Sequence, residues 1–385
     1  MGVLDLFKRK KENKRDYFSN FVTRYDTNTK AITEDNSLAL TAVYAAVRII
    51  AETIAQLPFN YYLETDKGNE IYRESPLDLL VSQEPNNYQT KYVFFETMMN
   101  SLILYGNAYA YIEKINNQPV SLYCLDPRKV QVKYIDGNLI YNVLDGNYDS
   151  SQIIHIPDFT TDGYTGKSRI IIARDSIEHS LRIQDYGLKF FRDGARFVSG
   201  ILTHPGKLSP EAMKNLKQSW QATYNSQQFN TAVLEEGMKF ENFNLAPEQA
   251  QYLQSREFSV REISRIMKVP VFMLSDHAAS TYSNIEHESL NFAKNTITPL
   301  LSKIEQEFNK KLIPDVDKGK TYFLHNLRGL LRGDSNSRAD YYGKLFNIGV
   351  LSQNDIRKME SMSTIDDGNK YFVPLNMVAV EKQND

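Results

Sequence analysis

Apolar residues at helical and strand spacing divide the chain into three stretches. In the first, to about Asp158, helices are predicted over Thr41–Gln56 and Thr90–Tyr105, because each has a broad apolar face and is followed by a residue that ends helices, Pro58 or Gly106. The wide apolar face of Thr41–Gln56 indicates that this helix is buried.

Strands and turns fill the rest of this first stretch. Runs of apolar residues predict the strands, and the dipeptides Asn116-Asn117 and Asp136-Gly137 predict the turns between them. Asp-Gly suits a tight hairpin because both positions accept a positive φ. The predicted strands are Ala108–Lys114, Val120–Leu125, Val130–Ile135, Asn138–Val143 and Gln152–Ile156.

The second stretch, about residues 169–312, is predicted to consist mainly of three long helices. Apolar residues at steps of three and four, from Ile170 to Phe191, mark one face of the first helix, and the second covers Glu248–Met267. Pro299 lies inside the third, and we expect a kink there because proline clashes with the carbonyl four residues earlier. The face of the third helix comprises Ile285, Ser289, Phe292, Thr296, Leu300, Ile304, Phe308 and Leu312.

A short α/β insertion separates the first two long helices, and small elements follow the third. Ser209 is the expected N-cap of the helix in the insertion, and Ser352 is that of the last helix, with Asp355 at capping-box spacing. The predicted elements are strands Ser199–Thr203, Ala232–Leu234, Lys239–Phe243 and Thr321–Leu324, and helices Ser209–Tyr224, Ser337–Ile348 and one after Ser352. The pattern as a whole predicts an α+β protein.

Composition narrows the possible functions. The net charge is −2, whereas a protein that grips DNA neutralises phosphates with a marked excess of Lys and Arg. A surface of this charge would touch DNA without holding it. The basic run Phe7–Arg15 is expected to be a disordered arm, and the uncharged stretch Asn36–Val47 is too short for the roughly 20 residues of a membrane span. The single cysteine, Cys124, excludes an intrachain disulfide.

Two motifs of catalytic sites are present only in part. Gly166-Lys167-Ser168 stands where a phosphate-binding loop would, but position 161, which the motif requires to be glycine, is Thr161. His287-Glu288 begins a zinc-protease motif whose second histidine would fall on Asn291. The sequence therefore predicts no catalytic residue, no metal and no cofactor.

Two other functional classes remain as alternatives. Asp126, Asp158 and Asp162 are the carboxylates that a metal-dependent nuclease would gather, although the first two lie beside prolines, where turns explain them. DNA cleavage with magnesium that is lost on Asp162→Ala would favour the nuclease. A monomeric scaffold or adaptor is the other alternative, and the absence of any ring would favour it.

Short motifs occur in a fixed order along nearly the whole chain, from about Leu40 to Met359. They are Ile54–Pro58, Pro85-Asn86, Gly106–Tyr109, Asp162–Gly166, Phe190–Ala195, Val269-Pro270, Thr281–Asn284 and Asn354–Arg357. As an ordered set they resemble the portal (head–tail connector) proteins of tailed bacteriophages, in the smaller class found in many long-tailed phages. Members of that family usually have glutamate at the position of Asp355, and the C-terminal region is short here.

The resemblance implies an α+β portal fold with a mixed α/β wing, a two-helix stem, a small α/β clip, a long kinked helix and a short helical crown. The implied parts are a flexible basic arm at 1–35, the wing at 36–168 with 313–334 returning to it, stem helices at 169–196 and 247–274, the clip at 197–246, a tunnel loop at 275–284, the kinked helix at 285–312, and a small crown with tail at 335–385.

The resemblance also implies a structural role without enzymatic activity. Copies of the chain, commonly twelve in a dodecamer, would close into a ring at one capsid vertex of the virion after assembly in the host cytoplasm. Double-stranded DNA would pass through non-specifically during packaging and ejection. The implied partners are the terminase large subunit, the major capsid and scaffolding proteins and a head-completion adaptor, with no membrane.

Two groups of residues are candidates for the working surfaces. The tunnel loop is small and polar with one carboxylate, which suits loose contact with moving DNA; its candidates are Asp276, His277, Ser280, Thr281, Tyr282 and Asn284. A thin pair of stem helices is expected to need neighbouring copies to cover its apolar faces. The inter-subunit candidates are Ile177, Leu181, Leu188 and Phe191.

Overall fold

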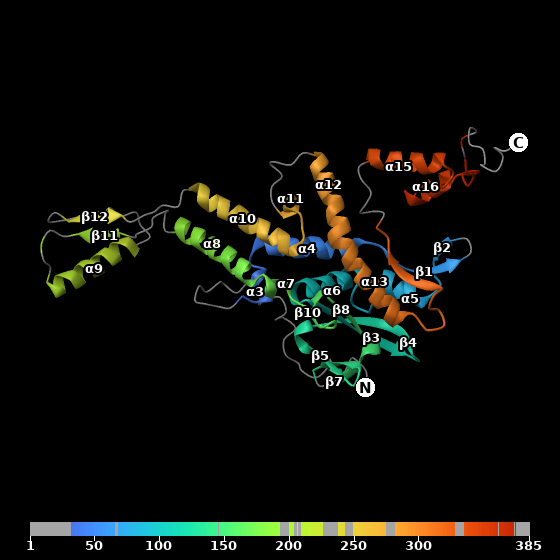
Figure 1. Ribbon diagram of the computed structural model, residues 1–385, viewed down its shortest axis with the longest axis horizontal. Helices are drawn as coiled ribbons and strands as arrows, with labels where there is room; N and C mark the ends of the chain where they lie inside the picture. The colour runs from blue at the N-terminus through green and yellow to red at the C-terminus, as the bar shows by residue number, and fades with distance from the viewer. Residues whose placement is uncertain are drawn as a thin grey trace. The chain divides into compact units, whose positions relative to one another are not determined.

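The computed structural model describes residues 32–65, 68–144, 146–192, 200–203, 206, 209–225, 238–242, 249–274, 282–327, 335–360, 362–372 and 374. The fold is α+β, with long helices and small antiparallel sheets (Figure 1). The chain divides into two compact units. Unit 1 comprises residues 1–50, 100–108 and 157–276, and unit 2 comprises 51–99, 109–156 and 277–385.

Unit 1 contains the two longest helices, α8 (Arg174–Arg192) and α10 (Gln249–Met267), with the α/β insertion between them in the chain. Within the insertion, β11 (Gly200–Thr203) pairs antiparallel with β12 (Lys239–Asn242). The other elements of unit 1 are α3 (Glu34–Ser37), β9 (Phe159–Thr160), β10 (Gly166–Lys167), α7 (Arg169–Ile172), α9 (Pro210–Asn225) and α11 (Val271–Leu274), and both units share α4 (Thr41–Gln56) and α6 (Lys91–Tyr105).

Unit 2 contains three small sheets, with strand orders β13-β1-β2, β4-β3-β8 and β5-β6-β7. Their strands are β1 (Phe59–Thr65), β2 (Gly68–Ile71), β3 (Asn107–Ile115), β4 (Gln118–Leu125), β5 (Val130–Ile135), β6 (Asn138–Val143), β7 (Gly146–Asp149), β8 (Ile153–Pro157) and β13 (Thr321–His325). The helices, besides α4 and α6, are α5 (Pro76–Ser82), α12 (Tyr282–Phe292), α13 (Thr298–Leu312), α15 (Ser335–Asn347) and α16 (Gln353–Met359).

Aromatic rings from four elements form the core of unit 2. The ring of Phe59 on β1 lies 5.4 Å from Phe95 on α6, 5.3 Å from Phe308 on α13 and 5.7 Å from Phe323 on β13, between centroids. His325 stacks on Phe59 at 4.2 Å, and none of the four phenylalanines is more than 2% exposed. Full burial of one such side chain stabilises the folded state by roughly 1.5–3 kcal/mol. The packed rings therefore give unit 2 a hydrophobic core of its own.

Helix α13 also closes the outer edge of strand β13. The Asn309 side chain accepts the N–H of Phe323 at 2.6 Å and donates to its carbonyl at 3.4 Å, as a neighbouring strand would. Glu305 accepts the N–H of His325 at 2.9 Å and lies 3.0 Å from its Nδ1. These contacts satisfy backbone groups that an edge strand leaves open.

Lys91 fixes the end of helix α4, where the sequence has the motif Ile54–Pro58. Its ammonium group donates to the carbonyl of Ala55 at 2.8 Å and to that of Leu57. Burial lowers the pKa of Lys91 to about 8. The helix therefore ends on a partly buried cation, which satisfies the carbonyl of Ala55 in its last turn and that of Leu57 just beyond it.

Local predictions are confirmed where the signal is short-range. Helix α4 has the predicted bounds, and α6 begins one residue later than predicted. Both predicted tight turns have positive φ, of 52° and 65° at Asn116-Asn117 and of 50° and 82° at Asp136-Gly137. Ser209 caps α9 as expected, with its Oγ accepting the N–H of Ala212 at 3.2 Å.

The third long helix departs from its prediction. Instead of one helix kinked at Pro299, the chain forms α12, five π-helical residues at Ala293–Ile297, and then α13. The irregularity falls one turn before the proline because the pyrrolidine ring displaces the carbonyl four residues earlier, that of Asn295. Thr298 donates its hydroxyl to a carbonyl inside this π-helical turn at 2.9 Å.

Other differences come from long-range pairing. Strand β12 pairs with β11. The predicted strand at 232–234, expected to pair with the strand at 239–243, lies outside the described residues, as do residues 1–31 of the predicted arm. Residues 32–35 of that arm are structured, because Thr33 and Asn36 form a capping box at the start of α3. Strands β1, β2 and β7 and helix α5 were not predicted.

Candidate functional site

Helices α8 and α10 lie alongside one another and run in opposite directions (Figure 1). Late in α8, Gly187 faces Tyr252 of α10, whose hydroxyl occupies the space that a Cβ at position 187 would need. Glycine inside a helix costs about 0.5–1 kcal/mol relative to alanine. The close contact with Tyr252 explains why this position is nevertheless glycine.

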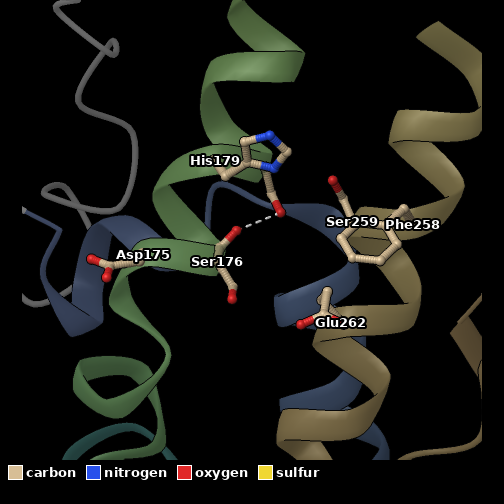
Figure 2. A pocket seen from close by; sticks show the side chains of 7 residues that line it. Asp175, Ser176, His179, Phe258, Ser259 and Glu262 are labelled. Atoms are coloured by element: carbon tan, nitrogen blue, oxygen red, sulfur yellow. Dashed lines mark hydrogen bonds between the residues drawn. The ribbon is translucent and has the colours of Figure 1, made fainter. Parts of the chain in front are cut away.

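A shallow pocket lies between the two helices (Figure 2). Its lining includes Ser180 and Ser259, both buried, whose small side chains let the helices approach. His179 stands on the α8 side and Phe258 on the α10 side, as Figure 2 shows. The remaining lining residues are Asp175, Ser176 and Glu262.

This pocket contains the residue types of a serine hydrolase without their arrangement. The hydroxyls of Ser180 and Ser259 each donate to a carbonyl one turn earlier on their own helix, at 2.8 and 2.9 Å. In the described part of the chain, His179 makes no hydrogen bond to either serine. Backbone N–H groups inside a helix are bonded within it, so they cannot form an oxyanion hole. Ser180 and Ser259 therefore lack the arrangement of a serine nucleophile.

Carboxylates considered as metal ligands have local partners instead. Asp126 accepts the N–H of Arg128 at 3.1 Å and pairs with its guanidinium at 3.0 Å. Asp162 accepts the N–H groups of Thr165 and Tyr164, and these bonds, that of Thr165 first, hold the pKa of Asp162 far below its usual value. Among the described residues, no cluster of three His, Cys, Asp or Glu is suited to a metal, and no helix is long and apolar enough to cross a membrane.

Arg169 joins the beginning of α7 to the end of α10. Its guanidinium bonds Asp158 at 2.5 and 3.0 Å and donates to the carbonyl of Met267 at 3.2 Å. Asp158 is thus one half of a largely buried ion pair, beyond the turn role expected from its place after proline. Ser168, from the phosphate-loop-like motif, caps α7 and donates to the carbonyl of Leu104 at 2.5 Å.

Two of the ordered motifs fit together at this junction. The Asn107 side chain accepts the N–H of Gly166 and donates to its carbonyl, each at 2.8 Å. The backbones of Gly106 and Gly166 approach so closely that a Cβ on either would collide with the other segment, and Gly106 has φ of +77°. Only glycine fits at both positions. The motifs are therefore complementary halves of one joint at the base of the helix pair.

The predicted stem residues separate into buried and exposed positions. Ile177 and Leu181 are 1% and 5% exposed in the single chain, so their burial needs no neighbouring copy. Leu188, further along the same apolar stripe, is 54% exposed. Phe191 is within α8, but its side chain is outside the described residues. Leu188 is thus the described candidate that can contact a second copy.

Most of the predicted tunnel loop lies outside the described residues. This holds for Asp276, His277, Ser280 and Thr281. Tyr282 and Asn284 have helical backbone at the start of α12, so the loop ends earlier than residue 284. Their inclusion in the loop is corrected, because the helix begins before the apolar face that marked it in the sequence.

The sequence prediction missed other exposed apolar residues of this region. Leu253 and Phe258 on α10 are 58% and 51% exposed, and Ile171 and Ile172 on α7 are also exposed. The sequence of α10 could have indicated these residues, because single apolar residues stand there among polar neighbours, away from the buried face of the helix. Together with Leu188, the two residues on α10 add to the exposed apolar surface of the paired helices.

Comparison with known proteins decides which family has these features. The sequence model for the phage portal protein family matches residues 41–361. The probable portal protein of Streptomyces phage phiC31 is 31% identical over 379 residues, which cover 92% of this chain and 82% of that protein. The chain belongs to the phage portal protein family. Portal proteins are structural components of the phage particle that connect head and tail at a capsid vertex, and DNA packaging is their general role.

Solved structures share the portal fold. The HK97 family phage portal protein from Corynebacterium diphtheriae matches with a TM-score of 0.62 and 14% identity, covering 79% of this chain and 98% of that one. The neck of a native gene transfer agent particle, computed with C12 symmetry, matches with a TM-score of 0.56 and 20% identity, covering 86% of this chain and 93% of that one. These matches, at low identity, establish the α+β portal fold predicted from the sequence.

Proposed function

We propose that twelve copies of this chain form a closed ring at one capsid vertex, through which double-stranded DNA is packaged and later ejected. The observation that carries the ring is the exposed apolar surface of the α8–α10 pair, at Leu188, Leu253 and Phe258. Large apolar side chains exposed on both helices of the pair are available for contact with a neighbouring copy. Head-to-tail contacts between copies cover such surfaces and close into a ring. The C12 symmetry of the similar neck supports the copy number.

The charges of the paired helices suit DNA that moves. Helix α8 carries four basic and three acidic residues, and α10 carries three and two. Arg182, Arg261 and Arg265 each pair with a glutamate about one turn earlier on the same helix. Such exposed pairs contribute little to stability, but they reduce the charge available to phosphates. A ring of these helices binds DNA weakly because few phosphates are neutralised.

The remaining parts follow from the family resemblance. In this proposal the insertion 197–246 is the clip that docks the terminase large subunit, and the wing at 36–168 meets the major capsid and scaffolding proteins. The segment 275–284, which runs into the start of α12, contacts DNA, and a head-completion adaptor binds after packaging. Rings assemble in the host cytoplasm. The role is structural and not enzymatic, in keeping with the incomplete catalytic motifs.

A single substitution on α8 tests the ring. Leu188→Asp is expected to reduce ring formation at least tenfold, because a charge placed in an apolar contact costs more than about 1.4 kcal/mol. Leu144→Asp is the matched control, since both leucines are 54% exposed. Native mass spectrometry of the purified chain measures the fraction in rings, and complementation of a portal-deficient phage measures DNA per head. Undiminished rings with Leu188→Asp would contradict the assignment of this helix pair.

A further inference from the structure

Helix α10 ends on a turn whose last carbonyl is bound by a residue from outside the helix. Lys268, just after the helix, has a φ of +57°, in the left-handed region that residues other than glycine seldom adopt. The N–H of Val269 donates to the carbonyl of Ser264 at 3.1 Å, as in a Schellman motif, which satisfies carbonyls that a helix end leaves open. The carbonyl of Met267 instead accepts the guanidinium of Arg169 at 3.2 Å.

The same guanidinium is held on its other side by Asp158. The two bonds measure 2.5 and 3.0 Å, and the paired side chains are 13% and 11% exposed. The backbone N–H of Asp158 donates to the carbonyl of Gly106 at 2.8 Å, so the carboxylate is fixed to the joint of Gly106 and Gly166. Arg169 is also the first residue of α7, which leads directly into α8. One side chain therefore ties the end of α10 to the joint from which α8 begins.

A largely buried ion pair is better suited to positioning these helices than to stabilising them. Removal of two charges from water costs about as much free energy as their attraction returns. The planar guanidinium can bond a carboxylate and a carbonyl at the same time in fixed directions, whereas an ammonium group acts as a point charge. At the far end of the pair, the contact of Gly187 with Tyr252 sets the spacing of the helices. Arg169 sets it at their base.

We propose that Arg169 is a positioning residue, which fixes the base of α10 against the base of α8 so that the pair keeps its spacing while DNA passes through the ring. This inference rests on the proposed function. Without the link, the helices stay packed at Gly187 and Tyr252 but separate at their bases. The width of the ring opening then varies from one subunit to the next.

Replacement of Arg169 by lysine tests the link. Arg169→Lys keeps a positive charge beside Asp158 but cannot bond the carboxylate and the Met267 carbonyl together. Hydrogen exchange of assembled rings is expected to be about tenfold faster in residues 260–268 and unchanged around Tyr252, because the pair opens locally at its base. Complementation of a portal-deficient phage should give heads that contain less DNA.

The matched control is Arg182→Lys on helix α8. Arg182 also bonds a carboxylate through two nitrogens, at 3.0 and 2.6 Å, but its partner Glu178 lies one turn earlier on the same helix. The exchange of residues 260–268 and the DNA per head should therefore equal those of the parent protein.

Asp158→Asn gives a second reading at a residue far from α10 in the chain. The amide keeps the size of the carboxylate but has one acceptor oxygen, so faster exchange at 260–268 is expected here too. Exchange or DNA content equal to the parent's in both variants would overturn the role of Arg169 and leave the ring intact. A lower urea midpoint with unchanged exchange would also overturn it, because Arg169 would then only stabilise the subunit. Absence of rings in the parent would overturn the proposed function and, with it, this inference.

Discussion

The aromatic core of unit 2 and its crown segment, residues 335–372, contain similar apolar side chains. Those of the core are buried, whereas those of the crown segment are mostly exposed. Phe59, Phe95, Phe308 and Phe323 are at most 2% exposed, whereas Phe372 is 50% exposed. The core brings together strands and helices from distant parts of the chain, which surround each ring. The crown segment instead has its backbone fixed by Asn354 and leaves its apolar side chains outward. Residue type therefore does not decide burial; the number of elements packed around a side chain does.

On helix α8 of unit 1, a single apolar stripe contains both buried and exposed side chains. Ile177 and Leu181 are buried by the single chain, and Leu188, further along the same face, is exposed. The stripe in the sequence therefore records two different contacts, one inside the subunit and one that we assign to a neighbouring copy. Periodicity alone does not separate them, because both require the same apolar spacing.

Truncation of one aromatic side chain in each region is expected to give the largest difference in stability between them. Phe308→Ala is expected to destabilise the subunit by about 3–5 kcal/mol, because it leaves a cavity among fully surrounded rings. Phe372→Ala, at a side chain that is half exposed, should cost under about 1 kcal/mol. Urea unfolding of both purified variants measures the difference. Similar losses in the two would show that the crown segment has a core of its own.

A smaller effect is expected from acid. Burial lowers the pKa of His325, and in the described part of the chain its buried Nε2 has no hydrogen-bond partner, so the folded state holds the ring neutral beside Glu305. An unfolded histidine titrates near pH 6.5, so the unfolded chain takes up the proton first as pH falls. The free energy of unfolding should therefore have its full value above about pH 6.5 and should decline as the pH falls below it.

The control for this pH effect is a histidine outside the core. His325→Phe keeps an aromatic ring in the stack and should flatten the decline measured by urea unfolding between pH 7.5 and pH 5, whereas His287→Gln, at an exposed position, should leave it unchanged. An unaltered slope with His325→Phe would mean that other groups cause the acid sensitivity. The core would then be insensitive to protonation at that position.

The parts of the fold that were predictable from sequence depend on neighbours within a few residues. The turn at Asp136-Gly137, the cap at Ser352 and helix α4 have signals of that kind, and each is found. The pairing of β1 with β13, the ion pair of Arg169 with Asp158 and the buried state of Leu181 depend on residues far away in the chain. No local sequence pattern encodes these long-range contacts. The apolar stripe of α8 was therefore predicted, but its division into buried and exposed residues was not.

The central claim is that exposed apolar surface on the α8–α10 pair is covered by identical copies around a closed ring. Native mass spectrometry of the purified chain over a range of concentrations tests it most directly. The account predicts a single closed assembly of twelve subunits of 44.4 kDa each. A 44.4 kDa species alone at every concentration, with the helix pair folded, would contradict it.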